Sequence, residues 1–134
     1  FFENELNLEN KDLKKYKNIY LVLLSNDIRK LKLGQKVLDY KSQIINDQKK
    51  RFEDLQIIDE VKFQTLADEI NSFDIVHPCI GENFSFLNSI RKKRNLELNF
   101  VLSEEDKFSW QFSNKGFFNF KNNIPKILTN FNLQ

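Results

Sequence analysis

The sequence has few of the residues from which metal and nucleophilic sites are usually built. Its 134 residues include one histidine, His77, and one cysteine, Cys79. A structural zinc site usually takes four histidine or cysteine ligands, so we expect no metal site and no cofactor. A single cysteine excludes an internal disulfide, which is typical of a reducing, intracellular compartment. We interpret these two residues as a loop histidine and a structural thiol.

Glycine and methionine are also scarce. The three glycines, Gly34, Gly81 and Gly116, form no phosphate-binding pattern. Methionine is absent, so we expect that Phe1 is not an initiator and that the chain is a fragment or a processed product. The longest apolar run, residues 19–24, is far shorter than the roughly 20 residues of a membrane-spanning helix. The sequence therefore predicts no membrane span.

Apolar and charged residues are present in the proportions of a folded protein. Hydrophobic residues make up 40% of the chain and charged residues 30%. Phenylalanine dominates the aromatic residues, with 14 against one tryptophan, and we expect most of these rings in a core or an interface. The net charge of +2 is too small to indicate nucleic-acid binding by itself. Heavy use of asparagine, lysine, isoleucine and phenylalanine suggests an AT-rich genome.

The clearest pattern is a series of apolar residues spaced by sevens, which Asp59 interrupts. A seven-residue apolar repeat keeps one narrow helix face apolar over many turns, and another helix must cover such a face. We therefore predict that residues 1–72 form a helical arm or hairpin of two or three helices, with the character of a coiled coil. The predicted partner-binding seam consists of Leu31, Leu38, Ile45, Phe52, Leu66 and Phe73.

Two places in this arm leave the helix boundaries open. The first helix is expected to start near Lys11 and to pass through residues 19–24, although that run also fits a buried strand. Gly34 marks a kink, a break or a tolerated weak point, because glycine is unfavourable inside a helix. The seam could face a second copy or related subunit. It could instead pack on the chain's own sheet.

The pattern changes after residue 72, and residues 73–134 are predicted to form a small α+β head. A connection over residues 73–83 leads to a short helix, which Asn95 ends. Alternating apolar residues then predict an antiparallel three-stranded meander, with Phe100, Trp110 and Phe112 on its buried face. The predicted strands cover residues 96–102, 108–112 and 117–120, and a last helix starts at residue 124.

Two groups of charged residues suggest binding or chemistry. The last turn of the short helix carries Arg91, Lys92, Lys93 and Arg94, which are candidate nucleic-acid contacts. Glu60 and Lys62 have the Glu-x-Lys spacing of a large group of metal-dependent nucleases, with Asp47 or Asp54 as a further acid. Helical periodicity on both sides favours a solvated helix face for the second group.

From the sequence we interpret the protein as a non-enzymatic protein–protein interaction module, a scaffold or subunit of a complex. The helical seam would bring about oligomerisation, and the head would offer a docking surface. A nucleic-acid-binding domain that uses the basic helix end is the first alternative. A ligand-sensing domain of a larger receptor and a magnesium-dependent nuclease are the others. An apolar pocket between helices and sheet would favour ligand sensing.

Overall fold

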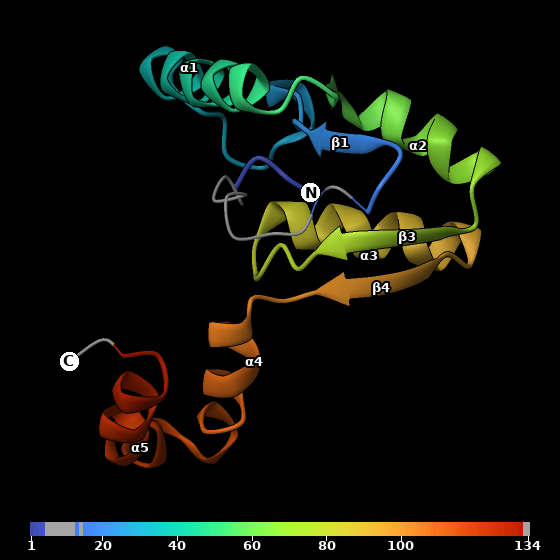
Figure 1. Cartoon of the computed structure of the whole chain (residues 1–134). Helices are drawn as coiled ribbons and strands as arrows, with labels where there is room; N and C mark the ends of the chain where they lie inside the picture. The colour runs from blue at the N-terminus through green and yellow to red at the C-terminus, as the bar shows by residue number, and fades with distance from the viewer. Residues whose placement is uncertain (5–12, 14, 133–134) are drawn as a thin grey trace. The chain divides into compact units, whose positions relative to one another are not determined.

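The computed structural model describes residues 1–4, 13 and 15–132, which belong to two compact units, residues 1–101 and 102–134 (Figure 1). Strands and helices alternate through the first unit. Its elements are β1 (Ile19–Val22), the 3-10 turn η1 (Asn26–Ile28), α1 (Gln35–Arg51), β2 (Leu55–Ile58), α2 (Glu60–Glu69), β3 (Ser72–Val76), α3 (Glu82–Arg94) and β4 (Glu97–Val101). The domain boundary predicted at residues 72/73 falls inside this unit, at the start of β3.

The strands of the first unit pair in parallel. β1 pairs with β2, with Ile19 opposite Leu55, and β3 pairs with β4, with Ser72 opposite Glu97. On the other side of β1, Phe2 forms a parallel bridge with Val22. Parallel neighbours need a crossover, and α1 supplies it between β1 and β2 while α3 supplies it between β3 and β4. The helix α2 connects the two strand pairs.

Successive residues of β1 face two different cores. Val22 and Leu24 belong to the larger core, which β2, α2, β3 and α3 complete with residues such as Phe63 and Leu87. Leu21 turns the other way and packs in the smaller core. A strand with helices on both faces is apolar at every position, which explains the continuous run over residues 19–24.

The predicted helical arm is wrong, because two strands interrupt it. Residues 19–22 form β1, residues 55–58 form β2, and the helical stretches between and after them are α1 and α2. Gly34 is the residue before α1, so the expected weak point is where that helix starts. The helix start expected near Lys11 lies outside the described residues. Apolar residues spaced by three and four in short strands resemble a helical period, and for this reason residues 19–22 and 55–58 were predicted to be helical.

The predicted antiparallel meander is also wrong. Residues 97–101 do form a strand, β4, but its partner is β3, which the sequence suggested was a connection. The other two predicted strands are helical. Ser103 caps the first of these helices by accepting a hydrogen bond from the backbone N–H of Asp106 at 3.0 Å. Three acidic residues in that first turn also favour the helix.

The second unit consists of α4 (Glu104–Trp110), the 3-10 turn η2 (Ser113–Lys115) and α5 (Phe117–Asn130). Aromatic rings pack together within this unit. The ring centroid of Phe108 lies 5.5 Å from that of Phe112 and 5.6 Å from that of Phe131. Phe108 and Phe112 are four residues apart, a helical spacing that alternation by twos also contains. Trp110, expected on a buried sheet face, is 41% exposed.

Candidate functional site

The chain segment after β1 is held against two helices by side-chain carboxylates. Glu60, the first residue of α2, accepts hydrogen bonds from the backbone N–H of Ser25 at 2.9 Å and from its hydroxyl at 2.6 Å. Glu82, the first residue of α3, accepts one from the backbone N–H of Lys30 at 2.9 Å. The ends of two helices therefore fix residues 25–30.

Arg29 is the buried centre of this arrangement. Its guanidinium forms an ion pair with Glu3, donates to the carbonyl of Leu24 at 3.0 Å, and reaches Glu82 at 3.3 Å. The side chains of Arg29 and Glu3 are 5% and 1% exposed. Lys41 of α1 adds a second cation, 3.1 Å from Glu3. The Nε of Arg29 and the Oε2 of Glu3 have no hydrogen-bond partner among the described residues.

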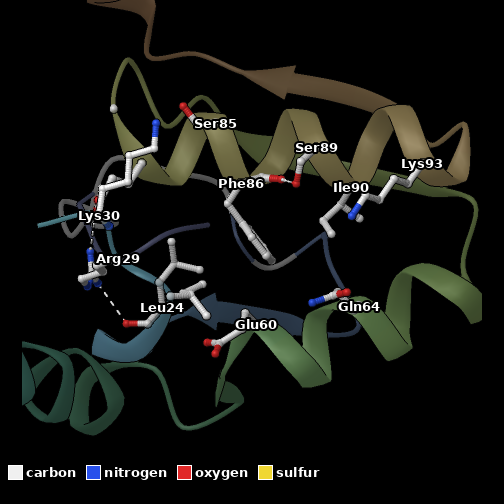
Figure 2. Close-up of a pocket in the computed structure, with 13 residues that line it drawn as sticks. Leu24, Arg29, Lys30, Glu60, Gln64, Ser85, Phe86, Ser89, Ile90 and Lys93 are labelled. Carbon is white, nitrogen blue, oxygen red and sulfur yellow. Dashed lines mark hydrogen bonds and ion pairs between the residues drawn. The ribbon is translucent and has the colours of Figure 1, made fainter. Parts of the chain in front are cut away.

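A pocket of about 570 Å³ opens beside Arg29 (Figure 2). Figure 2 shows α3 on one side of it and Glu60 and Gln64 of α2 on the other. The apolar lining comes from Leu24, Ile28, Phe86 and Ile90, and the polar lining from Arg29, Lys30, Glu60, Gln64, Glu82, Ser85, Ser89 and Lys93, with Gly81 at the start of α3. The volume is in the range of small-molecule sites, roughly 300–1,000 Å³.

One end of the pocket lies where ligands bind in parallel α/β sheets, at the carboxyl ends of strands, and the pocket then follows α3 to Lys93 in its last turn. Leu24 follows β1, Glu60 follows β2, and Gly81 follows β3 after a short loop. The backbone of Gly81 has φ of 113°, a conformation that favours glycine and that begins α3 here. The strand ends therefore bring together three segments that are far apart in the sequence.

The two carboxylates of the pocket are held in the charged state. Burial would raise the pKa of Glu60, but the hydrogen bonds from Ser25 outweigh it and lower the pKa below its usual value. Desolvation likewise opposes the charge of Glu82, and the hydrogen bonds from Lys30 and Arg29 lower its pKa. Neither carboxylate is therefore set up as a proton donor at neutral pH.

The six residues of the predicted seam do not share one helix face. Leu31 precedes α1 and is 81% exposed, whereas Ile45 of α1 is buried against β1 and β2. The positions of the others are Leu38 on α1, Phe52 just after it, Leu66 in α2 and Phe73 in β3. The chain's own cores thus cover Ile45, Phe52, Leu66 and Phe73 at least in part.

The basic cluster is at the carboxyl end of α3, as the sequence indicated. Asn95 ends that helix in the left-handed conformation, with φ of 50°. Arg94 is paired with Asp68 of α2 at 2.5 Å, while Arg91, Lys92 and Lys93 are exposed. Of the four, only Lys93 lines the pocket.

The remaining candidates are dispersed. Glu60 and Lys62 lie in the first turn of α2, while Asp47 is on α1 and Asp54 precedes β2. Among the described residues, no three histidine, cysteine or acidic side chains are grouped as metal ligands. His77 accepts a hydrogen bond at Nδ1 from the backbone N–H of Cys79, which is exposed. The two residues therefore contact each other within the loop that follows β3.

Sequence reasoning did not find Arg29, Ser25, Gln64, Ser85 and Ser89. A usable signal was present in the alternation of strand and helix, since binding residues in parallel sheets follow the strands. That signal was lost once residues 19–24 and 55–58 were assigned to helices. Comparisons with family models, curated proteins and solved structures return no match for this chain.

Proposed function

We propose that the first unit binds a small organic anion that also carries an apolar group, as a ligand-sensing domain would. The observation that carries this proposal is the pocket itself, which combines an apolar wall with three cationic side chains, Arg29, Lys30 and Lys93.

The rest of the lining suits the same ligand. Leu24, Ile28, Phe86 and Ile90 offer apolar surface, and Ser85 offers a hydroxyl donor. The hydroxyl of Ser89 donates to the carbonyl of Phe86 at 2.7 Å. The lysines at positions 30 and 93 add two cations at the rim, and both are exposed. A carboxylate or phosphate would be attracted to this rim, and an aromatic or aliphatic part would lie against α3.

Binding of 1-naphthyl phosphate to the full chain tests this function. We expect saturable binding by calorimetry, and weaker binding of its two halves, 1-naphthol and inorganic phosphate. Lys93→Gln should weaken binding of the whole probe, because that cation lines the pocket. Lys92→Gln is the matched control, because Lys92 is an exposed neighbouring lysine that does not line the pocket.

A blocking variant separates the pocket from general charge effects. Ser89→Phe should abolish binding of the probe by filling the pocket, while the exposed position keeps the fold intact. Equal binding by wild type, Ser89→Phe and Lys93→Gln would rule the pocket out. No binding of the probe or of either half by wild type would count against the proposed ligand class.

Self-association is a second candidate function, and exposed apolar residues near α1 favour it. Leu31 is 81% exposed, Tyr40 63% and Val37 44%. In the assembly interpretation these residues contact a second copy of the chain. Light scattering tests it: Leu31→Ser with Tyr40→Ser should convert an oligomer into a monomer, and a monomeric wild type would end this interpretation.

A further inference from the structure

α5 has one face packed within its unit and another face that is apolar and exposed. On the packed side, Asn119 donates a hydrogen bond to the carbonyl of Phe112 at 2.7 Å, and Phe131, directly after α5, contacts Phe108. Phe117 and Phe118 are instead 71% and 77% exposed. We call the exposed apolar residues the α5 strip: Phe117, Phe118, Ile124 and Leu128.

The α5 strip follows the helical period. Phe117, Ile124 and Leu128 are seven and four residues apart, so they share one side of the helix. Lys121 has the same spacing and lies on this side between them. The strip therefore combines large apolar groups with a long cationic side chain, which can extend its charged end away from an apolar layer.

The charge of this region is of one sign. Lys107 is paired with Glu104 of α4 at 2.6 Å, but residues 108–134 after it have three lysines and no acidic residue. Two copies meeting through this region would bring like charges together, whereas an anionic surface would complement it. Among the described residues, no helix is long and apolar enough to cross a membrane, so α5 would have to lie along a surface.

We propose that α5 binds the surface of a membrane that contains anionic lipids, with the α5 strip entering the headgroup layer. Phenylalanine and leucine insert at this depth, and lysines beside them are attracted to the negative surface potential. The proposal is independent of the pocket in the first unit. It concerns residues that the proposed ligand does not use.

Flotation of the full chain with lipid vesicles tests the proposal. We expect binding to phosphatidylcholine vesicles that contain phosphatidylserine, weaker binding to phosphatidylcholine alone, and a decline with added salt. Phe117→Ala with Phe118→Ala should lower the partition coefficient at least about tenfold. Ile80→Ala is the matched control, because Ile80 is 91% exposed but lies in the first unit.

A charge variant tests the electrostatic part separately. Lys121→Gln should weaken binding to the anionic vesicles about fivefold and leave binding to phosphatidylcholine nearly unchanged. Lys36→Gln, at an exposed position of α1, should have no comparable effect on binding. The substituted phenylalanines are exposed, so circular dichroism melts should match those of wild type.

Three results would overturn the proposal. The first is no flotation of wild type with either vesicle at low salt. The second is undiminished flotation of the Phe117→Ala/Phe118→Ala variant. The third is a doubled mass in solution without vesicles that this variant abolishes, which would assign the α5 strip to a second copy.

Discussion

At the scale of single residues, the first unit has an unusual feature, which is a buried cluster of charged side chains. Arg29 and Lys41 both pair with Glu3, and two polar atoms of the cluster have no partner among the described residues. A buried ion pair is weak evidence for stability, yet breaking one leaves an uncompensated charge. The cluster thus couples residue 3 to the pocket lining through Arg29.

We predict that Glu3→Ala destabilises the protein by about 3–5 kcal/mol, because Arg29 loses its buried counterion. Urea unfolding measures this change. Asp47→Ala is the matched control: it removes an exposed carboxylate 3.3 Å from Arg51 and should cost less than about 0.5 kcal/mol. Equal costs for the two variants would show that the cluster is not buried in solution.

The Ser25–Glu60 contact predicts a pH-dependent contribution to stability. The pKa of folded Glu60 is lowered, so the contribution is complete above the unfolded pKa, about 4.3, and is lost as pH falls through the folded pKa. Ser25→Ala should therefore destabilise most near neutral pH and much less in acid, once the pH has fallen below the folded pKa of Glu60. Urea unfolding of wild type and variant at both pH values measures the difference.

Thr65→Val provides a control for that pH dependence. Its hydroxyl donates to the carbonyl of Val61 at 3.2 Å, with no titrating group involved. The cost of this substitution should be the same at both pH values. A Ser25→Ala effect that stayed constant with pH would show that the hydrogen bonds do not favour charged Glu60.

At the scale of elements, the sequence predicted helices better than strands. Helical spacing correctly indicated α1, and the basic last turn with Asn95 correctly placed the end of α3. β1 and β2 are four residues each and contribute apolar residues to both cores, so they lack the alternation that identifies a half-buried strand. β3 lies in the stretch of residues 73–83, which was predicted to be a connection because it contains Pro78 and Gly81 and no sustained period.

The failure at α4 and α5 has a different cause. Alternation over residues 108–112 contains the i, i+4 pair Phe108 and Phe112, which suits a helix equally well. Acidic residues at 104–106 and the cap at Ser103 were the better signals, and they indicated a helix start. Which elements pair across the fold depends on contacts distant in sequence, and no local pattern specifies those.

Asp59, which interrupts the seven-residue series, acts as the cap of α2. Its side chain accepts a hydrogen bond from the backbone N–H of Lys62 at 2.8 Å. Asp59→Ala should therefore cost about 1 kcal/mol, whereas Asp59→Asn should cost little, because asparagine caps as well. Thermal unfolding followed by circular dichroism measures both. A loss shared equally by the asparagine variant would point to charge and not to capping.

At the scale of the whole molecule, the core belongs to one unit. Every buried hydrophobic residue among those described lies between Phe2 and Leu96, within residues 1–101. The helices α4 and α5 contain no buried residue in their described parts. Stability should therefore come mainly from the first unit, where the pocket is also found.

We predict that a fragment of residues 1–101 folds by itself and unfolds cooperatively in urea, with a midpoint close to that of the full chain. It keeps both cores and all of the parallel strand pairs. Circular dichroism is the suitable measurement, because the only tryptophan, Trp110, is absent from the fragment. A fragment without a cooperative transition would mean that residues 102–134 are needed for folding.

Leu87→Ala, made in the fragment and in the full chain, measures how independent the first unit is. Leu87 of α3 is 0% exposed in the larger core, so its truncation should cost about 2–5 kcal/mol. If the first unit folds independently, the two backgrounds should give the same cost within about 0.5 kcal/mol, because distant sites without shared partners are additive. A clearly larger cost in one background would show that residues 102–134 contribute to the packing around α3.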